Sequence, residues 1–229
     1  MTFHPDAGLD PEPPNLILIS ADNIQFHVHR ARLLHASSNL FNLLLLYQDS
    51  TITLTEKSEV VAIFLHCVYG IPFASRPSPK DILASFDTLK QYGIPPDRYA
   101  YPRAPLFEAT VPALESLDFA IEIYARAAEH RLPDLASFAS SVLLSYPLSS
   151  ITNDLAVRMG PIYLRKLFVL HNQRVQTLRQ ILSTPPICHP TTPECGSDGQ
   201  RRLLMDWDMI TAEMIMSATP GQTTHFCSP

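Results

Sequence analysis

Two short runs near the start of the chain place the strictest limit on what it can fold into. The run Leu16-Ile17-Leu18-Ile19 is apolar throughout, as in a buried strand, and residues 24–29 alternate apolar and polar side chains with a period of two. The four residues between the runs, Ser20-Ala21-Asp22-Asn23, have the composition of a tight turn. We therefore expect a hairpin whose second strand has Ile24, Phe26 and Val28 on one face and Gln25, His27 and His29 on the other.

Further short elements follow the hairpin closely. Residues 30–36 favour a short helix, and Ser37 or Ser38 could cap a second helix that holds Leu40, Phe41, Leu44 and Leu45. Residues 51–54 predict a third strand. A helix is expected to open at Thr55 and to end at Gly70. Its apolar stripe consists of Val60, Val61, Ile63, Phe64, Cys67 and Val68. This order predicts an α+β fold, in which a small sheet is ringed by helices.

The order and spelling of these elements resemble the BTB/POZ domain. The resemblance is carried by family landmarks that occur in order and at near-usual spacing: Asp22, Phe26-His27-Val28-His29, Leu33-Leu34-His35-Ala36-Ser37-Ser38, Phe41 and Tyr69-Gly70. It implies a protein–protein interaction module without catalytic activity. It also implies that His29 is a structural residue, and that Asp22 is either structural or part of the charged pocket of a dimer.

The rest of the chain extends this module. Residues 1–12 are expected to form a flexible tail, and residues 13–148 the BTB/POZ domain, with an insert at 72–113 before a closing helix pair. Residues 149–183 resemble a BACK-type helical extension, with a short helix that ends at Gly160 and a longer one that opens at Pro161. Residues 184–229 read as a linker and a C-terminal helix, in which Trp207 is expected to be docked. Over its full length the chain resembles the short BTB proteins of fungi.

The insert contains one clear helical signal. Ser78-Pro79-Lys80-Asp81 is a typical helix start, and Gly93 is a typical stop. The stripe between them consists of Ile82, Leu83, Phe86 and Leu89. Residues 94–112 are rich in proline and favour an extended wrap. Its aromatic residues, Tyr99, Tyr101 and Phe107, could pack back on the domain or form a recognition lip.

Composition limits the classes of partner. Hydrophobic residues make up 46% of the chain, enough for a packed core, and the net charge is −5 without a basic run. Nucleic-acid binding is therefore not expected, because it needs clustered Lys and Arg. No apolar run approaches the ~20 residues of a membrane span, and no signal peptide is evident. We expect an intracellular protein, cytoplasmic or nuclear, that has no cofactor.

Two groups of residues have metal-ligand chemistry. His27 and His29 share one face of a strand, so an alternative of another class is a small metal-dependent hydrolase. The preferred interpretation is structural, because His29 matches the family's landmark histidine. A second group could gather zinc, although its spacing fits no standard zinc motif and an unligated loop is the default. It consists of Cys188, His189, Cys195, His225 and Cys227.

The resemblance implies two binding surfaces within residues 16–49. BTB domains commonly form homodimers through the first strand and first helices, although all the leucines here could instead pack within one chain. The candidate dimer residues are Leu16, Leu18, Leu33, Leu34 and Leu43. Family members that act as substrate adaptors of ubiquitin ligases bind cullin-3 through an apolar-x-Glu motif. This chain has Tyr47-Gln48-Asp49 at that place, with Asp in place of Glu. A transcriptional co-repressor platform is the other expected role.

Overall fold

The chain separates into two compact units, Met1–Ser141 and Val142–Pro229. The structure is a computed structural model, and it describes residues 3–192 and 195–217. Helices and a small sheet together confirm the predicted α+β class. Within the described residues, no helix combines the length and the apolar character that a membrane span requires.

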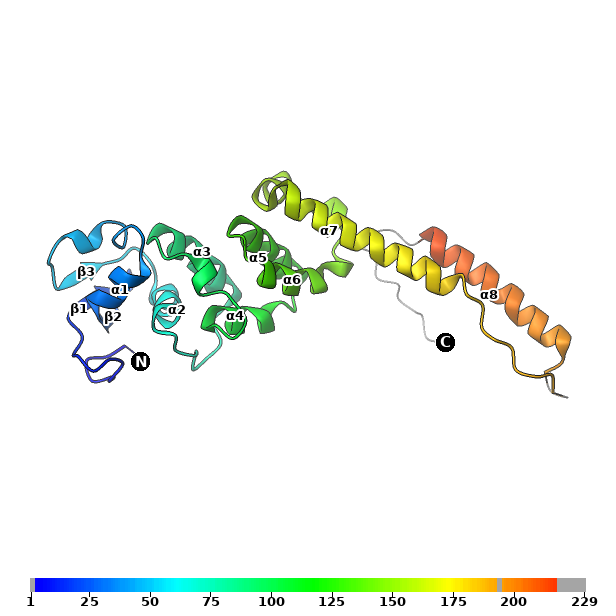
Figure 1. Cartoon of the computed structure of the whole chain (residues 1–229), viewed down its shortest axis with the longest axis horizontal. Helices are drawn as coiled ribbons and strands as arrows, with labels where there is room; N and C mark the ends of the chain where they lie inside the picture. The colour runs from blue at the N-terminus through cyan, green and yellow to red at the C-terminus, as the bar shows by residue number, and fades with distance from the viewer. Residues whose placement is uncertain (1–2, 193–194, 218–229) are drawn as a thin grey trace. The chain divides into compact units, whose positions relative to one another are not determined.

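A three-stranded sheet forms one side of the first unit (Figure 1). Its order is β2-β1-β3, with β1 (Leu16–Ile19) in the centre, β2 (Gln25–Val28) antiparallel to it and β3 (Thr51–Thr53) parallel to it. The predicted hairpin is confirmed, and its turn closes through a hydrogen bond of 3.0 Å from the Ser20 amide to the Ile24 carbonyl.

The helix α2 (Ser58–Tyr69) is the centre of this unit and contacts α1 (Arg30–Ala36) as well as helices later in the chain. Seven of its residues are buried, which is more than a single apolar stripe would provide. This is expected for a helix that is covered on several sides. It begins three residues after the predicted Thr55. It ends where predicted, at Gly70, whose φ of 67° is a left-handed conformation that favours glycine.

The predicted insert is an integral part of this core. Its helix α3 (Pro79–Gln91) packs on α2, and Ile82, Phe86 and Leu89 have no exposed surface. As predicted, α3 begins with a capping serine, whose hydroxyl accepts a hydrogen bond from the Asp81 amide at 3.2 Å.

The extended wrap predicted for residues 94–112 is wrong in part. That segment contains the helix α4 (Pro105–Thr110) and two 3-10 turns (Pro96–Arg98 and Val111–Ala113). Proline stands at the first turn of each of these elements, where its missing N–H costs no hydrogen bond. Of the three aromatic residues, Phe107 is buried, Tyr99 is half-buried and Tyr101 is exposed.

The expected helix pair is present as α5 (Leu117–Glu129) and α6 (Pro133–Val142). The flexible tail expected for residues 1–12 does not hold at Phe3, which is only 1% exposed. The Phe3 ring packs edge-on against His66 and Tyr69, at centroid distances of 5.4 and 5.3 Å. An apolar side chain three residues from the start therefore belongs to the core.

The second unit contains two long helices, α7 (Asn153–Leu182) and α8 (Ser197–Ser217), which lie side by side (Figure 1). Gly160, with φ 66° and ψ 170°, divides α7 into the two helices that were predicted. Trp207 of α8 is half-buried, in line with the docked helix. The same helix leaves Leu203 and Ile210 more than half exposed.

Candidate protein-interaction surface

Residues 37–49, called the leucine loop below, depart most from expectation. The right-handed helix predicted here is wrong, because φ lies between 55° and 64° from Leu40 to Leu43. Only a 3-10 turn, Leu44–Leu46, follows. Side chains provide the hydrogen bonds that a helix would otherwise supply: the Ser37 hydroxyl accepts from the Phe41 amide at 2.6 Å, and the Asn39 carboxamide accepts from the Asn42 amide at 2.8 Å. Such local bonds compete with helix formation.

The C-terminal end of α3 holds the first half of the leucine loop. Phe41 has no exposed surface and stacks on Tyr92, with ring centroids 4.1 Å apart and an interplanar angle of 12°. The Ser38 amide donates to the Gly93 carbonyl at 2.8 Å, and the Asn39 side chain donates to the Gln91 carbonyl at 3.0 Å. The loop conformation is therefore fixed by residues more than fifty positions away in the sequence.

Arg30 holds the second half of the leucine loop. Its guanidinium donates to the carbonyls of Leu45 at 3.2 Å and Tyr47 at 2.8 Å, and also to that of Asp49. Arg32 pairs with Asp10, with a closest N–O distance of 2.5 Å. Both arginines therefore have specific partners within the first unit. One guanidinium thus binds three carbonyls and holds the backbone at both ends of the Tyr47-Gln48-Asp49 segment.

The loop held in this way exposes several large apolar side chains. Exposed fractions are 39% for Leu40, 57% for Leu43, 58% for Leu46 and 69% for Tyr47, and these four residues are called the leucine patch. On α1, Leu34 is also exposed. Clustered apolar exposure of this kind marks binding surfaces in proteins.

The composition of the predicted dimer surface changes accordingly. Leu16, Leu18 and Leu33 are at most 1% exposed and belong to the core, which leaves Leu34 and Leu43 as its exposed members. The sequence did not indicate Leu40 as a surface residue. It predicted a right-handed helix that holds Leu40, whereas the left-handed turn leaves this side chain 39% exposed.

Asp22 caps α2. Its carboxylate accepts from the Ser58 amide at 2.8 Å and from the Ser58 hydroxyl at 2.6 Å. These hydrogen bonds, the one from the hydroxyl above all, lower the pKa of Asp22 to about 2. The ionised carboxylate also lies at a helix N-terminus, which favours negative charge. This geometry agrees with the structural role that was expected.

His29 is buried and has partners on both ring nitrogens. Nδ1 lies 2.9 Å from the Tyr69 hydroxyl, and Nε2 lies 2.9 Å from the Glu12 carbonyl. The Tyr69 hydroxyl also accepts from the His29 amide at 2.7 Å, so two of the residues that carry the sequence resemblance bind each other directly. This geometry agrees with a structural role for His29.

Across the described part of the chain, no group of three or more His, Cys, Asp or Glu residues could hold a metal ion. His27 and His29 therefore find no third ligand there, and Cys188, His189 and Cys195 do not form such a group. Both cysteines are free thiols. His225 and Cys227, the remaining members of the zinc hypothesis, lie outside the described residues.

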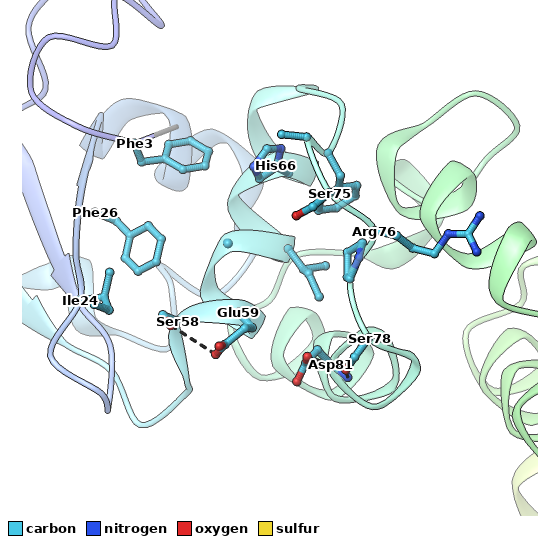
Figure 2. Close-up of a pocket in the computed structure, with 15 residues that line it drawn as sticks. Phe3, Ile24, Phe26, Ser58, Glu59, His66, Ser75, Arg76, Ser78 and Asp81 are labelled. Atoms are coloured by element: carbon cyan, nitrogen blue, oxygen red, sulfur yellow. Dashed lines mark hydrogen bonds between the residues drawn. The ribbon is translucent and has the colours of Figure 1, made fainter. Parts of the chain in front are cut away.

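A groove of about 560 Å³ opens between β2, the outer side of α2 and residues 73–78 (Figure 2). Phe26 of β2 and Ile24, which directly precedes this strand, line one wall, and Phe3 lines the upper end. Opposite them lie Ser75, Ser78 and other residues between α2 and α3. The groove does not include the leucine patch, so the first unit has two separate surfaces on which another polypeptide could lie.

No protein-family model and no curated protein sequence matches this chain.

Proposed function

We propose that the chain is a protein–protein interaction module of the BTB/POZ type, which acts as a homodimeric scaffold or adaptor through the leucine patch. One observation carries the proposal: a short loop is held in place from both ends and exposes four large apolar side chains. Apolar side chains on a preorganised backbone favour binding, because little conformational entropy is lost when the partner arrives. The landmark contacts of Asp22 with Ser58 and of His29 with Tyr69 support the BTB/POZ assignment.

A second copy of the chain is the partner that we propose for this patch. In a two-fold symmetric dimer the same patch meets itself, so a surface of leucines is complementary without any matching of charge. The core of such an interface is typically apolar and poor in charged residues. The patch itself has this composition, and its polar neighbours Gln48 and Asp49 are both exposed.

The same loop supports a role as a cullin-3 adaptor. Arg30 fixes the carbonyls of Tyr47 and Asp49, so the exposed Tyr47 ring and the Asp49 side chain extend from an organised backbone. Aspartate has one methylene less than the glutamate of cullin-binding members. A cullin would therefore have to approach closer to this loop.

Light scattering during size-exclusion chromatography tests the dimer. We expect the full chain to elute as a dimer and Leu43→Asp to elute as a monomer. Aspartate tolerates the left-handed conformation at this position better than leucine does, so the variant adds charge without backbone strain. The matched control is Leu203→Asp, at an equally exposed leucine of the second unit, which should remain dimeric. A monomeric wild type, or a dimeric Leu43→Asp, would refute the proposal.

Affinity purification and mass spectrometry test the adaptor role. Cullin-3 should be recovered with the wild-type chain and with Asp97→Arg, a control at another exposed aspartate, and lost with Asp49→Arg. Recovery that survives Asp49→Arg would show that this loop is not the cullin contact.

A further inference from the structure

The strand β2 has an outer edge that the sheet does not cover. In the order β2-β1-β3 it has a neighbour on one side only. The Ser20 amide donates to the Ile24 carbonyl, and Leu18 is opposite Phe26, so even-numbered residues of this strand bond to β1. In an antiparallel pair the backbone groups of the alternate residues, here Gln25 and His27, then point away from the sheet.

The chain itself pairs with this edge at one point. The His27 amide donates to the Phe3 carbonyl at 3.1 Å. The segment that follows Phe3, residues 4–14, lies with His27 and His29 and not with Gln25. The backbone N–H and C=O of Gln25 have no hydrogen-bond partner among the residues that the structure describes. Among residues 3–192 and 195–217, the edge is therefore free at Gln25 and occupied at His27.

The groove of Figure 2 lies next to the open part of this edge. Ile24 and Phe26, which flank Gln25, project into it, and Ala62 and Ile63 of α2 add further apolar surface. Side chains of an added strand would point alternately to the two faces of the sheet, so every second one would enter the groove. Backbone pairing and side-chain burial can thus occur together.

Carboxylates dominate the charge inside the groove. Glu59 and Asp81 lie at its lower end, whereas the Arg76 side chain extends away from it (Figure 2). Neither carboxylate forms an ion pair within the described part of the chain. Each accepts a hydrogen bond from a hydroxyl group: Ser58 donates to Glu59 at 3.2 Å, and Ser78 donates to Asp81 at 2.6 Å. A ligand with a cationic side chain would supply the missing charge.

We propose that the outer edge of β2 and this groove bind an extended, basic segment of a partner protein by β-strand addition. The segment pairs its backbone with Gln25, places an apolar side chain against Phe26 and directs a lysine or arginine toward Glu59 and Asp81. This surface is separate from the leucine patch, so loss of the dimer would leave the proposal intact.

Selection from a random twelve-residue peptide phage library on the immobilised full chain provides the first test. The expected peptides alternate apolar and polar residues, contain no proline in the pairing stretch, and carry Lys or Arg two residues from an apolar side chain. Absence of enrichment over an unrelated protein would overturn the proposal. So would enrichment of acidic or helical amphipathic sequences.

Two substitutions at Gln25 then separate backbone pairing from other effects. Gln25→Pro removes the outward N–H at an edge position that tolerates proline, and Gln25→Ala keeps the N–H while it removes the exposed side chain. The Kd of an enriched peptide, measured by fluorescence anisotropy, should rise about tenfold or more with Gln25→Pro and stay within about twofold with Gln25→Ala. Equal Kd values for the two variants would overturn strand addition, and circular dichroism confirms that both variants are folded.

The double variant Glu59→Gln/Asp81→Asn tests the charge. It keeps the hydrogen-bond acceptors and should weaken a basic peptide about tenfold at low salt, while an analogue with norleucine in place of lysine should bind both proteins equally. An unchanged Kd for the basic peptide would refute the assigned polarity. Self-association of the chain that is lost in Gln25→Pro would identify a second copy as the occupant, against the proposal.

Discussion

Gly93 is the position at which one methyl group should do most damage to the leucine loop. Its φ is 65°, and a Cβ built on it would lie 2.4 Å from Oδ1 of Asn39 and 2.8 Å from the Asn39 amide nitrogen. Real Cβ atoms do not approach other atoms so closely. In Gly93→Ala the Asn39 side chain and its backbone must therefore both move away from α3.

The expected loss of stability combines two contributions. A left-handed conformation costs alanine about 1 kcal/mol relative to glycine. Displacement of Asn39 breaks the hydrogen bonds that its Oδ1 accepts from Ser37 at 3.0 Å and from Asn42 at 2.8 Å, each with a net value of about 1 kcal/mol. We expect a loss of roughly 3 kcal/mol in the free energy of unfolding, a large share of the total for a small domain.

Gly70 provides the matched control. Its φ is 67°, but nothing lies within 4 Å of a Cβ built on it, so Gly70→Ala should cost only the conformational part, about 1 kcal/mol. Urea unfolding followed by circular dichroism measures both variants. Hydrogen exchange at the Phe41 amide should show that the extra loss in Gly93→Ala arises in the loop. Equal losses for the two variants would refute the close contact between α3 and the leucine loop.

Three further predictions concern single groups of the first unit. The folded pKa of Asp22, about 2, lies below its ordinary value of 3.8, so its contribution to stability is present above pH 4 and is lost as the pH falls toward 2. Asp22→Asn should therefore be less stable than the wild type at pH 7. Thermal unfolding should show that this difference in stability shrinks as the pH falls from 4 toward 2. A difference that stays constant would contradict the cap at Ser58. Burial raises the pKa of the Cys67 thiol to about 12, so a thiol reagent at pH 8 should label Cys188 in the native chain and label Cys67 only after unfolding. Phe3→Ala should cost about 3 kcal/mol in urea unfolding, because it removes a buried ring; a negligible loss would restore the expectation of a free tail.

The spacing of residues close together in the sequence determined much of the secondary structure. The alternation in residues 24–29 determined which side of β2 is buried, and the dense apolar stripe of α2 marked it as a central helix. Ser78 and Gly160 marked a helix start and a break because capping and left-handed conformations are properties of a few neighbouring residues. These features could be predicted because their causes lie within one turn of chain.

Contacts between residues far apart in the sequence decided the form of the leucine patch, the surface on which the proposed function depends. Residues 37–46 have the spacing of a right-handed helix, yet Phe41 stacks on Tyr92 and Asn39 binds the Gln91 carbonyl, and these partners are the last residue of α3 and the residue that follows it. Those contacts, together with the local bonds of Ser37, direct Leu40 outward instead of inward. The burial of Phe3 has the same kind of cause, since its neighbours His66 and Tyr69 lie more than sixty residues away. No periodicity in the sequence encodes such pairings, because only the folded chain brings these residues within contact distance.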